Sequence, residues 1–216
     1  GHSPHHRLPP VMKILVHTGG VFQTNGYILA EDNGTCIVID APAEIADFLD
    51  QNSLRATHLL LTHQHLDHIE DAATLRAKGA KILAFQDYAP EIIMERRLQE
   101  MGLPVEASPF EVDEVIGDGP TLKISHCSFE IHHVPGHSPD SISFYLSSES
   151  FLFAGDTLFN GSIGRTDLPG GNNEQLLDSI RQKLYSLPDE TAVFPGHGPR
   201  TSIGRERQTN PFCSNS

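Results

Sequence analysis

Short apolar runs alternate with amphipathic segments along most of the chain. Runs of apolar and β-branched residues bounded by Gly, Asn or Pro predict strands, and apolar residues spaced three and four apart predict helices. In the first half, the pattern predicts strands at 12–16, 21–30, 35–39, 58–61 and 81–85. It predicts helices at 43–50, 67–78 and 88–101, the last two ended by Gly79 and Gly102.

In the second half, the pattern becomes richer in strands. They are predicted at 121–125, 128–134, 141–146, 151–154 and 191–194, with one helix at 173–185. No internal repeat or linker is evident, so the simplest interpretation is one α/β (α+β) domain with two β-rich halves covered by helices. We expect that domain at 12–212, a tag or disordered extension at 1–11, and a tail at 213–216.

Composition and charge narrow the functional classes. The 216 residues are 38% hydrophobic and 20% charged, with a formal net charge of −13. An acidic chain without a run of Lys or Arg argues against binding to nucleic acid, and no apolar segment approaches the length of a membrane span. The three cysteines form no Cys-x-x-Cys pair, and the N-terminus has no apolar signal segment, so we expect a cytoplasmic protein. We expect a monomer or a homodimer.

The strongest chemical signal is the sequence Thr-His-Gln-His-Leu-Asp-His at 62–68. It places His63, His65, Asp67 and His68 directly after the apolar run 59–61, at the carboxyl end of a predicted buried strand. Imidazole and carboxylate groups are common ligands of divalent zinc, iron and manganese. A purely structural role would bury several chargeable groups without compensation, which is costly.

Three further strand ends carry residues of the same kind. His137, Asp156 and His197 each follow an apolar strand and adjoin a glycine, which permits close backbone approach. One such histidine is more often structural than a ligand. Three residues at equivalent strand ends, together with the first cluster, favour a metal site.

The series His-x-His-x-Asp-His, Pro-Gly-His, Gly-Asp and Pro-Gly-His resembles the ligand series of the metallo-β-lactamase superfamily over 12–212. The resemblance implies an αββα sandwich of two mixed sheets flanked by helices, with the site at one edge. It also implies two divalent metal ions, with zinc as the first expectation and iron or manganese as alternatives. The implied ligands are His63, His65 and His137 for one ion and Asp67, His68 and His197 for the other, with Asp156 as the bridge.

Segments 161–171, 195–199, 203–206 and 210–212 narrow the resemblance to short bacterial hydrolases of the glyoxalase II type. That resemblance implies a small-molecule thioester substrate of the S-lactoylglutathione kind, attacked by a metal-bridging hydroxide. Long glyoxalase II proteins also carry a C-terminal helical domain that binds glutathione, whereas this chain runs only to Ser216 after His197. Class B β-lactamases usually have Cys or Ser where this chain has Asp156.

Several alternatives stay open at this point. The persulfide dioxygenase family is also similar, and would use one iron at the positions of His63, His137 and Asp156. A lactonase and a non-catalytic metal-binding sensor are further alternatives. Asp67 and Asp156 could act as a general acid–base pair instead of as ligands.

Other residues carry weaker signals. Asp40 either supports the site from behind or caps the helix that follows it. Arg165 and Asp167 are expected to form a structural ion pair, and Asn25 and Tyr27 to serve strand packing. The predicted helix 88–101 either covers the cleft or is a charged surface helix.

Overall fold

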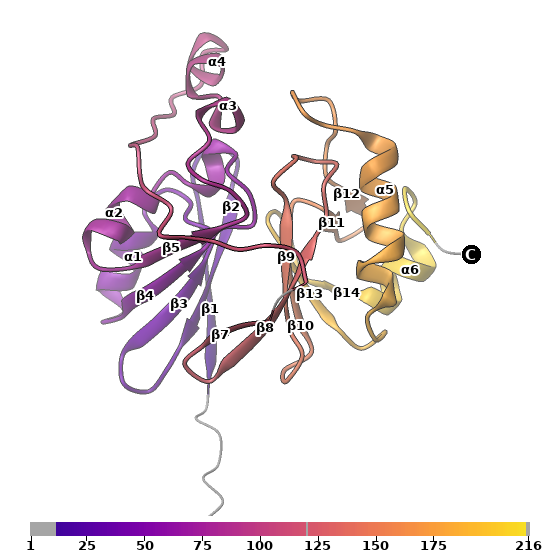
Figure 1. Ribbon diagram of the computed structural model, residues 1–216, viewed down its shortest axis with the longest axis horizontal. Coiled ribbons are helices and arrows are strands. Elements are labelled where there is room, and N and C mark those ends of the chain that lie inside the picture. Colours follow the sequence, from indigo (N-terminus) through magenta and orange to yellow (C-terminus); the bar gives the residue numbers. More distant parts are fainter. Residues whose placement is uncertain (1–11, 120, 215–216) are drawn as a thin grey trace, which may run out of the picture.

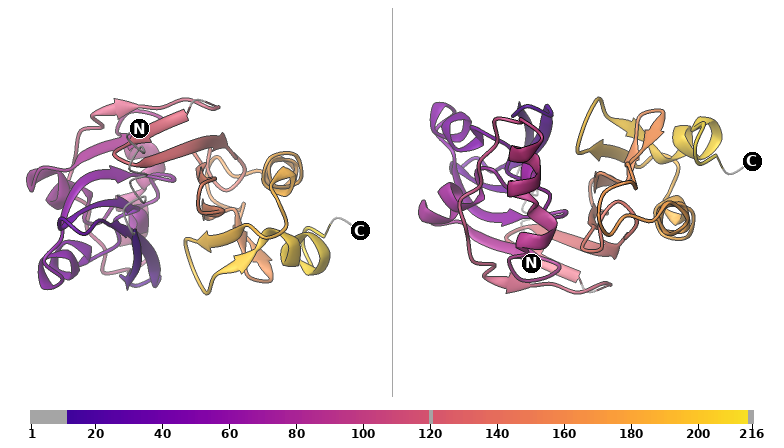
Figure 2. Two further views of the ribbon diagram at one scale, coloured as in Figure 1. Left: turned by 90° about the horizontal axis from the view of Figure 1, so that it is seen from below. Right: turned by 90° about the horizontal axis from the view of Figure 1, so that it is seen from above.

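The computed structural model describes residues 12–119 and 121–214. The expected extension 1–11 lies outside these residues. Two six-stranded sheets pack face to face, each with helices on its outer side, as Figure 1 shows for α1 and α2 on one flank and α5 and α6 on the other. The views from below and above in Figure 2 show the same separation into two halves. The predicted αββα sandwich of two mixed sheets is confirmed.

The first sheet has the strand order β1-β2-β3-β4-β5-β6. Its strands are β1 (Lys13–Gly19), β2 (Thr24–Ala30), β3 (Thr35–Ile39), β4 (Arg55–Leu60), β5 (Lys81–Ala84) and β6 (Glu114–Val115). Strands β1 to β3 are antiparallel, and β3 to β6 are parallel. Ile39 of β3 pairs with Leu60 of β4, so both strands end at the same edge, where Asp40 and the 62–68 motif follow.

The second sheet has the order β14-β13-β10-β9-β8-β7. Its strands are β7 (Thr121–Ile124), β8 (Cys127–His133), β9 (Ile142–Leu146), β10 (Phe151–Gly155), β13 (Ala192–Pro195) and β14 (Thr201–Ser202). Only β10 and β13 are parallel neighbours, and Gly155 pairs with Pro195 at their ends. Their carboxyl ends therefore bring Asp156 and His197 together. A small hairpin, β11 (Leu158–Phe159) with β12 (Ser162–Ile163), follows Asp156.

Apolar side chains fill three layers. The central layer between the sheets contains the fully buried rings of Phe129, Phe144 and Phe153. One outer layer lies under α1 (Ile45–Gln51) and α2 (Ala72–Ala77), and the other under α5 (Asn173–Gln182) and α6 (Ile203–Thr209). Removing this apolar surface from water is the main favourable contribution to folding, at about 25 cal/mol per Å².

The helix predicted at 67–78 is wrong as a continuous element. The chain forms a 3₁₀ turn, η1 (Leu66–His68), and then α2 begins at Ala72. Tertiary hydrogen bonds separate the two, because the Ala41 N–H donates to the His68 carbonyl at 2.8 Å and the Asp71 N–H donates to the Ala41 carbonyl at 3.0 Å. Ala41, in the loop after β3, thus bonds the His68 carbonyl and the Asp71 N–H, two backbone groups that a continuous helix would have paired within itself.

The helix predicted at 88–101 is also divided, into α3 (Pro90–Ile93) and α4 (Glu95–Glu100). Met94 between them has φ of 56°, in the left-handed region. The break allows Ile92 and Ile93 of α3 to be buried, whereas α4 buries none of its residues. The two helices lie at one end of the first half, near the gap between the halves (Figure 1).

Other predicted elements differ mainly at their ends. The strand predicted from residue 21 begins at Thr24, because the Gln23 N–H closes a turn onto the Gly20 carbonyl at 3.2 Å. The helix predicted at 173–185 ends at Gln182 and is followed by η2 (Leu184–Ser186). Helix α6 was missed; Ser202 caps it by accepting the Arg205 N–H. Among residues 12–119 and 121–214, no helix has the length and apolarity required to cross a membrane.

Candidate metal centre

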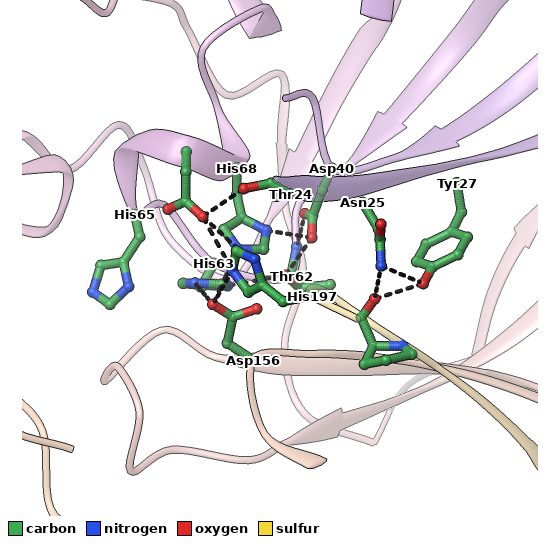
Figure 3. Close-up of polar contacts among 12 residues, drawn as sticks. Thr24, Asn25, Tyr27, Asp40, Thr62, His63, His65, His68, Asp156 and His197 are labelled. Carbon is green, nitrogen blue, oxygen red and sulfur yellow. Dashed lines mark hydrogen bonds and ion pairs between the residues drawn. The ribbon is translucent and has the colours of Figure 1, made fainter. Parts of the chain in front are cut away.

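All seven predicted ligand side chains converge at the edge where β4, β10 and β13 end. Figure 3 shows His63, His65, His68, Asp156 and His197 of this set. They form two groups, and within each group the candidate ligand atoms lie within 4.8 Å of one another. The groups are His63, His65 and His137, and Asp67, His68, Asp156 and His197. The resemblance implied the same division, with Asp156 shared between the two.

Two of the imidazoles are oriented by the same carboxylate. His68 Nδ1 lies 2.8 Å from Asp40 Oδ2, and His63 Nδ1 lies 3.0 Å from Thr62 Oγ1. The Thr62 hydroxyl in turn donates to Asp40 Oδ2 at 2.7 Å, so it must accept from His63. Both rings therefore carry a proton on Nδ1 and direct Nε2 into the centre.

Main-chain carbonyls orient two more rings. His137 Nδ1 donates to the Arg165 carbonyl at 2.7 Å, and His197 Nδ1 donates to the Phe22 carbonyl at 3.1 Å. Because a carbonyl can only accept, Nδ1 carries the proton in both residues and Nε2 is available to a metal. This outer support is typical of metal-binding histidines.

His65 differs, since it presents Nδ1 to the centre. His65 Nδ1 lies 3.0 Å from His137 Nε2. With its proton on Nδ1, a neutral His137 carries a lone pair on Nε2, so this contact is either a hydrogen bond from the Nδ1–H tautomer of a neutral His65 or a pair of nitrogens that face one cation. Burial lowers the pKa of His65 to about 3, so the ring is a neutral imidazole, the state that binds a metal.

Asp156 lies between the groups. Its Oδ2 is 3.1 Å from His197 Nε2, 3.2 Å from His68 Nε2 and 3.4 Å from His137 Nε2. The distance to His63 Nε2 is 3.7 Å. One carboxylate oxygen is therefore surrounded by imidazole nitrogens from both groups, which is the position that a bridging ligand needs.

Asp67 belongs to the second group alone. Its Oδ2 lies 3.3 Å from both His68 Nε2 and His197 Nε2, and accepts the Thr24 hydroxyl at 2.8 Å. Thr24 carried no signal in the sequence. Its role becomes visible only because β2 passes beside the motif that follows β4 (Figure 3).

The residues fit a bound cation. His63 Nε2, His68 Nε2 and Asp156 Oδ1 are buried without a hydrogen-bond partner in the described part of the chain. Burial opposes ionisation of Asp156, yet His68 and the other imidazoles hold the pKa of its carboxyl well below the usual range. Neutral imidazoles and ionised carboxylates are the states that bind metals. Burial strongly lowers the pKa of His63, whereas the neighbouring carboxylates, against burial, raise the pKa of His68 and His197, so a cation would displace a proton from these two rings. The cluster is therefore able to bind metal ions.

Glycine is required at the strand end before His197. A Cβ atom at Gly196 would collide with the Asp156 carboxylate and approach His68 Cε1 to 2.8 Å. There is thus a steric reason for glycine at position 196, since a residue without a Cβ atom leaves space for the candidate ligands Asp156 and His68.

Of the weaker signals, Asp40 supports the site. Its carboxylate also accepts the Thr62 N–H at 2.8 Å, whereas Glu44 occupies the N-cap position of α1. Asn25 and Tyr27 do more than pack, because both donate to the Pro195 carbonyl, at 3.1 and 2.5 Å, and thereby hold the loop that carries His197.

The loop after Asp156 contributes through its backbone. The exposed Arg165 and Asp167 side chains form the expected ion pair, with contacts of 2.7 and 2.9 Å, while the Arg165 carbonyl orients His137. Across from this loop, the divided segment α3–α4 lines the cleft above the metal centre. Its lining residues are Ile93, Met94, Arg97, Leu98 and Met101, and Phe22 and Leu168 line the same cleft.

Comparison with known families agrees with this geometry. Residues 19–197 match the model of the metallo-beta-lactamase superfamily. The probable metallo-hydrolase YqgX of Bacillus subtilis is 37% identical over 90% of this chain and 94% of its own length. The hydroxyacylglutathione hydrolase GloC of Haemophilus influenzae is 35% identical over 94% of this chain and 99% of its own length.

Three solved structures are also similar. The B3 metallo-beta-lactamase BLEG-1 superposes with a TM-score of 0.84 at 35% identity, over 93% of this chain and 99% of its own. TTHA1623 in a di-iron-bound form superposes with a TM-score of 0.76 at 33% identity, over 95% of this chain and 100% of its own. ETHE1 from Myxococcus xanthus superposes with a TM-score of 0.75 at 28% identity, over 93% of this chain and 84% of its own. With its ligand-type residues gathered at the shared edge of two sheets, this chain belongs to the metallo-beta-lactamase superfamily.

Proposed function

We propose that this protein is a metal-dependent hydrolase of thioesters. Thioesters of the S-lactoylglutathione type are the leading candidate substrates. The observation that carries the proposal is the position of Asp156 Oδ2, within 3.7 Å of imidazole nitrogens from both ligand groups. An oxygen bridge of this kind suits two similar ions held side by side. The name of the GloC relative supports hydroxyacylglutathione as the substrate class.

The first ion would be held by His63, His65 and His137, and the second by Asp67, His68 and His197, with Asp156 shared. Zinc is the first expectation, and iron is a real alternative because a similar structure, TTHA1623, contains two irons. When bound, such ions polarise a carbonyl group and lower the pKa of water, to about 7 in well-studied zinc enzymes.

The protein's own residues prepare the site for that chemistry. Asp40, Thr62 and Thr24 keep the ligand atoms in place, so little rearrangement is needed during reaction. The Oδ2 atoms of Asp67 and Asp156 each lie within 3.4 Å of two or more imidazole nitrogens, which favours ligand roles over a general acid–base pair. A thiolate leaves readily, since free thiols have pKa values near about 8.5, so no separate acid is required.

The test is metal quantification on the purified protein together with an S-lactoylglutathione hydrolysis assay. We expect close to two metal ions per chain, hydrolysis that is lost on chelation, and recovery when zinc or iron is restored. A cephalosporin is tested in parallel as a second candidate substrate, because one similar structure is a B3 metallo-beta-lactamase. Fully metal-loaded protein that cleaves the cephalosporin but no thioester would overturn the proposal.

A mononuclear iron persulfide dioxygenase is the second candidate. His63 Nε2 and His137 Nε2 lie 3.7 and 3.4 Å from Asp156 Oδ2, so these three residues could hold one iron without the second group. Metal analysis combined with oxygen uptake on glutathione persulfide separates the two candidates. One iron per chain with rapid oxygen uptake would favour the dioxygenase.

A further inference from the structure

Gln64 lies between two candidate metal ligands, His63 and His65, but its side chain binds elsewhere. The residue is fully buried. Its amide Nε2 donates to the carbonyls of Gln86 and Asp87 at 3.2 and 3.0 Å, and its Oε1 accepts the Ala89 N–H at 2.9 Å. One amide thus satisfies three main-chain groups of segment 86–89.

The ligand-bearing loop is also held from the other half of the molecule. The Gln64 N–H donates to Asp140 Oδ2 at 2.9 Å, and Asp140 Oδ1 accepts the Ser138 hydroxyl at 2.7 Å. Gln64 is therefore fixed through its backbone to the loop that carries His137, while its side chain reaches segment 86–89. It connects the metal-binding motif with both sides of the cleft.

Segment 86–89 leads directly into the wall of the cleft. Ala89 is the N-cap residue of α3, and α3–α4 contributes Ile93, Met94, Leu98 and Met101 to the cleft lining. Helix α4 has no fully buried residue, and its apolar contact with the layer under α1 and α2 is made by the half-buried Leu98. Met94, with φ of 56°, occupies a conformation that side chains other than glycine adopt at a cost. The position of this wall depends on these apolar contacts, including the buried Ile92 and Ile93, and on how the beginning of the segment is anchored.

We propose that Gln64 is a positioning residue that anchors the α3–α4 wall to the metal-binding motif, and that substrate binding depends on this anchor although Gln64 touches neither metal nor substrate. The effect on binding rests on the proposed thioesterase function, whereas the anchoring does not. An apolar side chain of equal volume would leave two carbonyls and one N–H of segment 86–89 without this partner.

The test compares zinc-loaded Gln64→Met and Gln64→Glu with the wild type and with Gln51→Met, a matched control at an exposed position of α1. In both Gln64 variants, we expect amide hydrogen exchange in 89–101 to accelerate about 10-fold or more, since hydrogen bonds that resist local opening are lost. Zinc content should be unchanged. KM for S-lactoylglutathione should rise roughly 5- to 10-fold while kcat changes less than about 2-fold.

Met101→Ala tests the wall without touching Gln64. Met101 is 67% exposed, so the truncation leaves the core intact, and it should raise KM without changing exchange in 86–93. Unchanged exchange in both Gln64 variants would overturn the anchor, whatever the activity. Loss of zinc together with a fall in kcat would also overturn it, because Gln64 would then act on the ligand loop itself. If the wild type hydrolyses no thioester, the proposed function fails, and hydrogen exchange alone decides the anchor.

Discussion

Asp40 Oδ2 lies 2.8 Å from His68 Nδ1, and the same oxygen accepts the hydroxyl of Thr62, which in turn accepts from His63. One buried carboxylate therefore orients one imidazole in each ligand group. Asp40 has φ of 64°, a conformation that Asp and Asn tolerate better than most residues. Its position at the end of β3 links the two groups from behind.

We expect Asp40→Asn to weaken metal binding while the fold persists. Asn accepts the same backbone conformation and can still accept the Thr62 N–H, but its amide cannot serve His68 and Thr62 as the carboxylate does. Loss of an outer partner of this kind typically lowers metal affinity or activity about 10- to 100-fold. A competition titration with a zinc chelator measures the change, with the exposed Asp32→Asn as control.

Asp156→Ala should remove the bridge between the groups. We expect metal content to fall from about two ions per chain to one or none, with thioester hydrolysis reduced on the order of 100-fold or more. Metal analysis and steady-state kinetics on the same preparation report both effects. A variant that keeps full activity with at most one ion would exclude the two-metal proposal.

Gly196→Ala should disturb the centre for a steric reason. The added methyl group would displace the Asp156 carboxylate and press on His68, both candidate ligands. We expect reduced metal content with an unchanged circular dichroism spectrum. Gly117→Ala is the matched control, because Gly117 has no positive φ and a Cβ there meets nothing within 4 Å. Equal metal content in the two variants would contradict the steric explanation.

Removal of metal should destabilise the protein. Ions that bind only the folded state at 100 times their Kd stabilise it by about 2.7 kcal/mol each. For a domain of about 200 residues, this corresponds to a Tm decrease of roughly 5–10 °C for each ion that chelation removes. Thermal denaturation with and without chelator measures it, and addition of zinc should restore the original Tm. An unchanged Tm would argue that the cluster holds no ion in the native protein.

Phe144→Ala should destabilise the central layer without involving the metal centre. Phe144 is fully buried between the sheets, with its ring edge-on to Phe129 at 6.2 Å. Loss of a buried ring with formation of a cavity typically costs 3–5 kcal/mol, so we expect a decrease of about that size in the free energy of unfolding. Urea denaturation measures it, with Phe212→Ala, 58% exposed, as the control.

The sequence was most informative where chemistry depends on local order. Histidine, aspartate and glycine at the ends of predicted strands indicated the metal centre, and the structure brings all seven predicted residues together. The predicted family and αββα architecture are confirmed. These conclusions depend on apolar patterns and short motifs, which can be recognised from the order of residues alone.

The sequence was least informative where distant segments compete with local preference. Two predicted helices are divided, one by hydrogen bonds between Ala41 and the 68–71 segment and the other at Met94. The support roles of Thr24, Asp40 and Gln64 were missed or left undecided for the same reason. The partners of their side chains lie between 22 and 43 residues away in the sequence.

By itself, the sequence determined which residue types stand at the strand ends, and hence the family and the chemistry of the cluster. Only the tertiary structure decided which nitrogen of each histidine faces the centre, because that depends on acceptors such as the carbonyls of Arg165 and Phe22, 28 and 175 residues away from the rings they orient. A side-chain proton is placed by its nearest partner in space, and linear order does not specify that partner.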